Sequence, residues 1–261
     1  MIRGMRTAST GMLAQQMQVD SIANNIANVN TTAFKKDQLA FRSLLYRTYR
    51  DPGAMTSTGE VTPTGLQIGG GVEVSSSVKL HFQGDLEPTG NPLDLAINGE
   101  GFFRILMGNG DFRYTRDGSF RRDVNGDLVT VDGYRMQPAI TIDPEAEGIA
   151  IAQDGTVTVT FGDGTSSEVG QIALFRFANP AGLKADGANL FLETESSGPA
   201  TQSEPGDEST GLLRQGFRER SNVQIVDELI ELIQAQRNYE VNSRTIRVAD
   251  EMLQQVSNLV R

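Results

Sequence analysis

The stretch IVDELIELIQAQRNYEVNSRTIRVADEMLQQVSNLV, residues 225–260, decides the fold. Apolar or aromatic side chains recur in it every seven residues, at Ile225, Leu232, Tyr239, Ile246, Leu253 and Val260. A second set with the same period lies between them: Glu228, Ala235, Asn242, Ala249 and Val256. Neither Gly nor Pro interrupts the pattern. The sequence therefore predicts a C-terminal helix over residues 221–261, roughly 60 Å long, whose apolar seam must be buried against another helix.

The N-terminal residues carry a weaker seam of the same kind. Spacings of three and four separate Ile2, Met5, Ser9, Met12, Gln16, Val19, Ala23 and Ile26. We predict that residues 1–45 form a helical region that pairs with the C-terminal helix in a coiled coil, with the first helix ending after Ile26 or Val29. A second short helical piece is expected over residues 36–49. The fold class is thus α+β, with a β-rich insertion between two terminal helices.

Residues 21–38, SIANNIANVNTTAFKKDQ, place Asn24, Asn25, Asn28 and Asn30 at the end of the first helix. Asparagine disfavours helices because its side chain competes for backbone hydrogen bonds. Two interpretations remain open. The asparagines form a frayed helix end and a turn, or their amides donate and accept hydrogen bonds across a crowded helical interface and fix its register.

The middle of the chain divides into an arm and a body. Residues 46–71 are rich in Gly, Thr and Ser, which predicts an extended or hairpin-like arm without a core of its own. In residues 72–220 alternating apolar stretches are separated by Asn-Gly and Asp-Gly pairs. Three successive gaps between these pairs are of seven or eight residues. This rhythm predicts a β-rich body of short antiparallel strands joined by tight hairpins.

Charge and composition exclude several functions. The chain of 261 residues has no Cys, one His and a net charge of −10. Residues 1–50 carry a charge of +5 and residues 51–220 a charge of −13. The acidic middle argues against nucleic-acid binding, and no stretch is apolar enough for membrane insertion or a cleavable signal. We expect no catalytic, cofactor-binding or metal site. Residues 123–127, DVNGD, resemble a calcium loop but have Gly too early and Tyr134 at the twelfth position, so they predict a hairpin turn.

Several motifs together resemble the axial proteins of the bacterial flagellum, the rod and hook family. They are ANNIANVNTTAFK (23–35), NPLDLAINGEGFFRI (91–105), YTRDGSF (114–120), GLLRQGFRERSNV (211–223) and QRNYEVNSRTI (236–246). Ala33 stands where many relatives carry Gly. Residues 46–71 resemble the segment peculiar to the distal rod type of this family.

The resemblance implies a structural subunit and no enzymatic activity. The chain would polymerise into a helical tube, the drive shaft that transmits torque from motor to hook, in the part of the basal body that crosses the periplasm. Implied partners are copies of itself, other rod proteins and the hook protein at its ends, the surrounding ring proteins, and the type III export apparatus, which would export it without cleaving a signal.

Three groups of residues are the candidate sites. The expected subunit interface consists of Met5, Met12, Val19, Ile26, Ile225, Leu232, Tyr239, Ile246 and Leu253. The N-terminal motif contributes Asn24, Asn25, Asn28, Asn30 and Phe34. The arm contributes Asp51, Pro52, Gly53, Gly65 and Gly69. On this hypothesis Leu232→Asp blocks assembly and leaves the β body folded.

Three alternatives remain. Another rod or hook-type axial protein would share the terminal motifs and differ in residues 46–71. A secreted β-rich adhesin or binding module would have a ligand groove and would not self-assemble. A glycan-acting enzyme, suggested by the many acidic residues, would cleave peptidoglycan with carboxylates.

Overall fold

The computed structural model describes residues 2–53, 63–207 and 210–259. The chain divides into two compact units. We call the first the helical unit; it comprises Met1–Ala27, Asp37–Val78 and Gln224–Arg261. We call the second the body; it comprises Asn28–Lys36 and Lys79–Val223.

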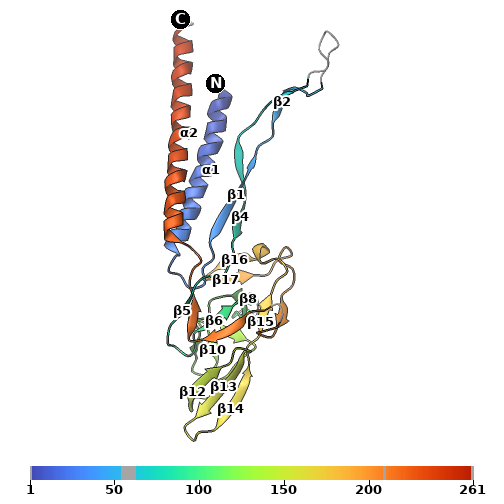
Figure 1. Ribbon diagram of the computed structural model, residues 1–261, viewed down its shortest axis with the longest axis vertical. Coiled ribbons are helices and arrows are strands. Elements are labelled where there is room, and N and C mark those ends of the chain that lie inside the picture. Colours follow the sequence, from blue (N-terminus) through green and yellow to red (C-terminus); the bar gives the residue numbers. More distant parts are fainter. Residues whose placement is uncertain (1, 54–62, 208–209, 260–261) are drawn as a thin grey trace. The chain divides into compact units, whose positions relative to one another are not determined.

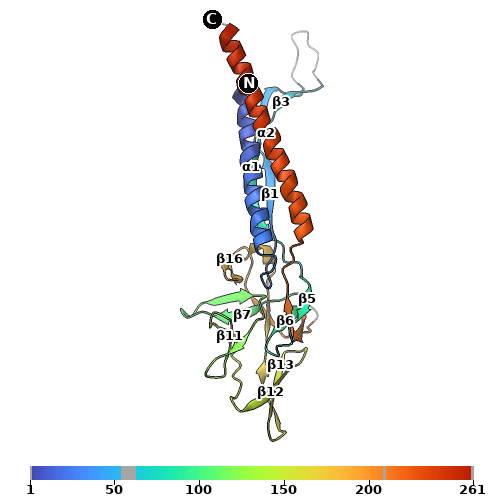
Figure 2. The ribbon, with the colours of Figure 1, turned by 90° about the vertical axis from the view of Figure 1, so that its left-hand side faces the viewer.

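The two predicted terminal helices are present in the helical unit. Helix α1 spans Ile2–Ala27 and helix α2 spans Ile225–Leu259. They lie side by side and run antiparallel (Figures 1 and 2). Gly11 of α1 allows close approach, because a Cβ atom there would lie 2.9 Å from the side-chain amide nitrogen of Asn242 on α2. The pairing of the terminal helices around an inserted β-rich body is confirmed.

The α2 residues buried deepest belong to the second of the two sets with a period of seven. Glu228, Ala235 and Ala249 are 0%, 3% and 8% exposed. By contrast, Ile225 and Tyr239 of the expected seam are 47% and 44% exposed. Small Ala side chains let the helix axes approach, so the larger seam residues lie beside the contact line and are half-buried: Leu232, Ile246, Leu253, and on α1 Met5, Met12, Val19 and Ile26.

The prediction of a short helix over residues 36–49 is wrong, because this segment forms strands. Strand β1 (Asp37–Ser43) pairs with β4 (Val72–Lys79), and β2 (Arg47–Arg50) pairs antiparallel with β3 (Leu66–Ile68) (Figure 1). The start of β1 alternates between half-buried and exposed residues. Its partner strand lies some thirty residues further along the chain, so the pairing that overrides local helix propensity is not visible locally.

In its described residues the body contains short strands and a 3₁₀ turn, Pro180–Gly182. The largest sheet has the order β16-β17-β8-β7-β11-β10-β9 and a smaller one the order β12-β13-β14. The strands are β5 (Leu86–Pro88), β6 (Leu95–Asn98), β7 (Phe103–Leu106), β8 (Phe112–Thr115), β9 (Arg121–Arg122), β10 (Leu128–Val129), β11 (Arg135–Gln137), β12 (Ala146–Ile151), β13 (Thr156–Phe161), β14 (Ser166–Gln171), β15 (Leu174–Arg176), β16 (Lys184–Gly187), β17 (Leu190–Leu192), β18 (Thr201–Ser203), β19 (Leu212–Gln215) and β20 (Phe217–Glu219).

The turns between these strands follow the predicted Asn-Gly and Asp-Gly pairs. Gly110, Gly126, Gly133, Gly155 and Gly164 have φ between +82° and +86°, a conformation that glycine adopts without steric cost. Residues 123–127 form the hairpin turn expected of them, with the amide of Gly126 donating to the carbonyl of Asp123 at 2.9 Å. Two apolar clusters fill the body, one around Phe103 and Phe120 and one of aromatic rings around Phe102 and Phe175.

Candidate assembly site

The N-terminal motif makes a tight turn at the start of the body. The amide of Thr31 donates to the carbonyl of Asn28 at 3.1 Å, and the Thr31 hydroxyl donates to the side-chain oxygen of Asn28 at the same distance. Ala33 has φ +55°, the left-handed conformation that glycine adopts more readily, and its amide donates to the carbonyl of Glu219 at 2.8 Å. The backbone at this position therefore suits Gly better than Ala.

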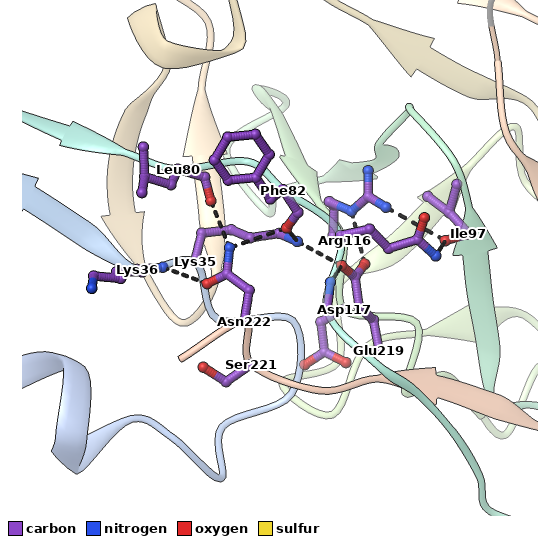
Figure 3. Close-up of polar contacts among 12 residues, drawn as sticks. Lys35, Lys36, Leu80, Phe82, Ile97, Arg116, Asp117, Glu219, Ser221 and Asn222 are labelled. Atoms are coloured by element: carbon purple, nitrogen blue, oxygen red, sulfur yellow. Dashed lines mark hydrogen bonds and ion pairs between the residues drawn. The ribbon is translucent and has the colours of Figure 1, made fainter. Parts of the chain in front are cut away.

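Next to this turn, Lys35 enters a buried cluster of charges (Figure 3). Its ammonium group lies 2.5 Å from Oε1 of Glu219 and 2.6 Å from the carbonyl oxygen of Phe82. The guanidinium of Arg116 binds Oε2 of the same Glu219 at 2.8 Å and also donates to the carbonyls of Gly99 and Gly101. The side chains of Lys35 and Glu219 are 0% exposed and that of Arg116 is 4% exposed.

The protonation equilibria follow from this geometry. Burial lowers the pKa of Lys35 from 10.5 to about 8; Glu219 opposes this shift and Arg116 adds to it. Burial acts to raise the pKa of Glu219, but Arg116, Lys35 and the hydrogen bonds that the carboxylate accepts together outweigh it and lower this pKa. At neutral pH the cluster therefore holds two cations around one carboxylate.

The side-chain amide group of Asn222 makes hydrogen bonds beside this cluster of charges. Its side-chain oxygen accepts from the amide of Lys36 at 2.8 Å, and its nitrogen donates to the carbonyls of Leu80 and Phe82 at 2.8 and 3.1 Å (Figure 3). With Glu219 and Lys35, it ties residues 33–36 and 80–84 to residues 219–222. We call this set of contacts the polar junction. Residues 33–36 are thus held in the body by residues 219–222, which precede helix α2 in the sequence.

In the helical unit, the contacts of Asn25 distinguish between the two interpretations of the asparagines. It is 1% exposed, and its nitrogen donates to the Asp37 carbonyl at 3.0 Å and to Oε2 of Glu228 at 3.2 Å. Its oxygen accepts from the amide of Asp37 at 2.9 Å. Asn25 therefore joins α1 to the start of β1 and to α2, as in the interpretation in which the amides bond across the interface.

The remaining residues of the motif have different surroundings. Asn24 donates to the carboxylate of Asp37 at 3.4 Å. Phe34 is buried, and the ammonium of Lys79 lies 5.2 Å from the centre of its ring. Asn30 is exposed and lines a polar cavity of about 320 Å³ that Arg218 and Arg220 also line.

The described residues of the arm form the β2–β3 hairpin, with residues 54–62 outside the described part of the chain. Asp51, Pro52, Gly53, Gly65 and Gly69 are all exposed. Gly65 is required by close packing, because a Cβ atom there would lie 2.7 Å from the carbonyl oxygen of Arg50 and from a ring carbon of Pro52. Exposed apolar side chains surround the hairpin: Leu45, Tyr46, Tyr49, Leu66 and Ile68.

Sequence reasoning did not assign a role to the polar junction. Arg116, Glu219 and Asn222 lie within the motifs YTRDGSF and GLLRQGFRERSNV, so the motifs were visible but the roles of these residues were not. Charged side chains are most often solvated, and burial is not encoded in a local pattern.

Among the residues that the structure describes, no group of three or more His, Asp and Glu side chains could hold a metal ion. No described helix has the length and apolar character needed to cross a membrane.

Comparison with known proteins decides among the alternatives. Three family models match: "Flagella basal body rod protein" over residues 5–35, "Flagellar hook protein FlgE/F/G D1 domain" over residues 96–159, and "Flagellar basal body rod FlgEFG protein C-terminal" over residues 214–259. The flagellar basal-body rod protein FlgG of Caulobacter vibrioides is 47% identical over 99% of both chains. FlgG of Buchnera aphidicola and of Borreliella burgdorferi are each 44% identical, over 99% and 100% of this chain and the whole of theirs.

The chain belongs to the FlgG family of flagellar basal-body rod proteins. It is a structural rod subunit, not an enzyme, and it assembles within the rod. The polar junction joins parts of the chain that two different family models match. Lys35 lies in the N-terminal family model, Glu219 and Asn222 lie in the C-terminal one, and the hydrogen bond from Lys35 to Glu219 links the two segments.

Proposed function

We propose that this chain polymerises with copies of itself into the helical tube of the distal rod, which transmits torque from the motor to the hook. The observation that supports this most strongly is a second apolar face on α2. Val226, Leu229, Ile230 and Ile233 are 69%, 44%, 57% and 50% exposed. Their spacing of three and four residues places them on one side of the helix.

This second face points away from the contact with α1. At 100° per residue, Ile230 and Ile233 lie roughly opposite Glu228 and Ala235, which are buried against the rest of the helical unit. A helix that is apolar on two sides is typical of the interior of a bundle. Because roughly half of each of the four side chains remains to be buried, covering them with another copy contributes about 3–6 kcal/mol gross. The expected interface residue Ile225 lies beside this face and would extend it, whereas Tyr239 lies on the side of Glu228.

The test is the double substitution Ile230→Asp and Ile233→Asp. It places two carboxylates on the second face and leaves the α1 contact intact, unlike Leu232→Asp, which alters a half-buried residue beside that contact. A matched control places the same charges on exposed apolar residues of the body, at Val124 and Val131, which are 94% and 64% exposed. Electron microscopy and sedimentation should show polymers of the wild type and of the control, and only monomers of the α2 variant. Normal polymers of the α2 variant would contradict the proposal.

The arm has a supporting role in this proposal. Its hairpin exposes Tyr49 at 49% and Leu66 at 51%, apolar surface that a short two-stranded hairpin cannot cover by itself. We propose that residues 46–71 reach over a neighbouring copy and resist bending of the polymer.

The route and the partners are part of the same proposal. We propose that the chain leaves the cell unfolded through the type III export apparatus without losing a signal, and joins a rod that crosses the periplasm. There it would contact other rod proteins, the hook protein and the surrounding ring proteins. The polar junction supports late folding, because Glu219, the ion-pair partner of Lys35, lies 184 residues further along the chain.

A further inference from the structure

Phe82 has the most exposed aromatic ring in the described part of the chain, at 72% of its surface. Covering a large apolar side chain with a partner removes it from water and lowers the free energy. Exposed aromatic rings of this kind are typical centres of protein interfaces.

The residues around Phe82 all make contacts that hold its backbone in place. The ring of His81 packs edge-on against Phe102 and Phe191, with centroids 5.6 and 5.3 Å apart. The side chain of Gln83 accepts from the amide of Gly99 at 3.0 Å and donates to the carbonyl of Ile97 at 3.3 Å.

The backbone of Phe82 itself belongs to the polar junction. Its carbonyl oxygen accepts from Lys35 at 2.6 Å and from Asn222 at 3.1 Å (Figure 3). The body therefore presents this ring on a backbone that is already ordered. Binding through such a residue loses little conformational entropy.

The body also contains a pocket suited to such a ring. It has a volume of about 200 Å³, and its apolar lining comes from Phe34, Leu190 and Phe191. A cavity of about 150 Å³ lined by Leu, Ile and Phe is sufficient to bind benzene. In this pocket Asn28, Lys35 and Asn189 add polar groups to the lining. Lys79 also lines the pocket, and its ammonium lies 5.2 Å from the centre of the Phe34 ring. The Phe82 ring of the same copy does not line this pocket.

The backbone around the pocket is strained. Ala33, Ala188 and Asn189 are the non-glycine residues with positive φ in the described chain, at +55°, +48° and +57°, and all three line the pocket. The side-chain amide of Asn189 donates to the backbone carbonyl of Thr32 at 2.9 Å and so joins the two strained turns. Strained backbone persists where the surrounding structure holds it, and it is concentrated at binding sites.

We infer that the Phe82 ring of one copy inserts into the pocket between residues 33–35 and 185–191 of a second copy. The inference rests on the proposed self-assembly and names a contact within it. A projecting residue and a pocket on the same chain form a heterologous contact, which can repeat without closing. The body would then add its own link between copies to that of the terminal helices.

The first test compares Phe82→Ser with Val124→Ser, a control that is 94% exposed on a hairpin of the body. Both variants should melt at the wild-type temperature, because neither side chain supports the fold. Phe82→Ser should raise the critical concentration for polymerisation roughly tenfold to a hundredfold, and Val124→Ser should leave it unchanged. Ala185→Phe, which fills the pocket, should act like Phe82→Ser, and the two effects should not add.

The second test places the photo-crosslinker p-benzoylphenylalanine at position 82 in a polymer of mixed ¹⁵N-labelled and unlabelled chains. Adducts should join labelled to unlabelled copies and should map to residues 33–35 or 185–191. If the wild type polymerises but Phe82→Ser keeps its critical concentration, or the adducts map elsewhere, the inference is overturned and the proposed function stands. A wild type that never polymerises counts against the proposed function itself.

Discussion

Replacing Glu219 by Gln removes the carboxylate that Lys35 and Arg116 share. Arg116, 4% exposed, then keeps its charge without a partner, and the pKa of Lys35, 0% exposed, falls further because Glu219 no longer raises it. Breaking a buried ion pair by removing one partner costs about 3–5 kcal/mol, because the other charge stays desolvated and uncompensated. The backbone amide of Gly84 donates to Oε1 of Glu219 at 2.8 Å, and it can still donate to the side-chain oxygen of the Gln. We therefore expect Glu219→Gln to lower the free energy of unfolding of the body by about 3–5 kcal/mol.

Replacing Lys35 by Met should cost much less. It removes one of the two cations and leaves Arg116 paired with Glu219, so the cluster becomes neutral. The carbonyl oxygen of Phe82 keeps its hydrogen bond from Asn222. The remaining loss is one charged hydrogen bond and some packing, for which we expect about 1–2 kcal/mol.

Urea unfolding followed by circular dichroism and by hydrogen exchange of residues 80–84 measures both effects. The matched control is Glu73→Gln, which breaks the exposed ion pair of Arg42 and Glu73, whose side chains are 66% and 40% exposed. This control should change stability by less than about 0.5 kcal/mol. A loss for Lys35→Met equal to or greater than that for Glu219→Gln would refute the charge balance assigned to the cluster.

Three further predictions follow from other parts of the chain. Burial, together with Lys35 and two further cations, lowers the pKa of His81 to about 4, so the unfolded chain binds more protons between pH 6.5 and 4. Stability should therefore fall by up to about 3 kcal/mol as pH drops through this range, and His81→Phe should flatten that part of a pH series of urea titrations. Asn25→Asp would set a carboxylate against Glu228 and should destabilise the helical unit more than Asn25→Ala; equal melting temperatures would contradict the proposed bond. Deleting residues 51–69 should leave an exportable, polymerising subunit whose polymers bend more in electron micrographs. Unchanged stiffness would contradict the proposal that the arm resists bending of the polymer.

The sequence predicted the terminal helices because their signal is local. A period of seven over 36 residues without Gly or Pro leaves few alternatives. It did not predict which set of positions faces α1. Ile225 and Tyr239 are larger than Ala235 and Ala249, but close approach of the helix axes favours the small residues, and the large ones remain for other contacts.

Features that depend on distant pairing were harder to predict. Residues 37–43 form a strand because β4 lies beside them, and nothing within the segment itself requires this. The buried cluster joins Lys35 to a residue near the other end of the chain, and a lysine beside a polar motif is normally expected at the surface. The turns at Gly110, Gly126, Gly133, Gly155 and Gly164 were predictable because each depends on two adjacent residues, Asn or Asp followed by Gly.

The accessibility of Ile230 before and after assembly tests the central claim most directly. The chain has no Cys, so Ile230→Cys gives a single reactive thiol on the second face of α2, and Val124→Cys gives a control on the body. Maleimide should modify both thiols rapidly in the monomer. In the polymer the thiol at position 230 should become at least tenfold slower while that at position 124 keeps its rate. Equal rates at position 230 in monomer and polymer would contradict the claim that copies join through this face.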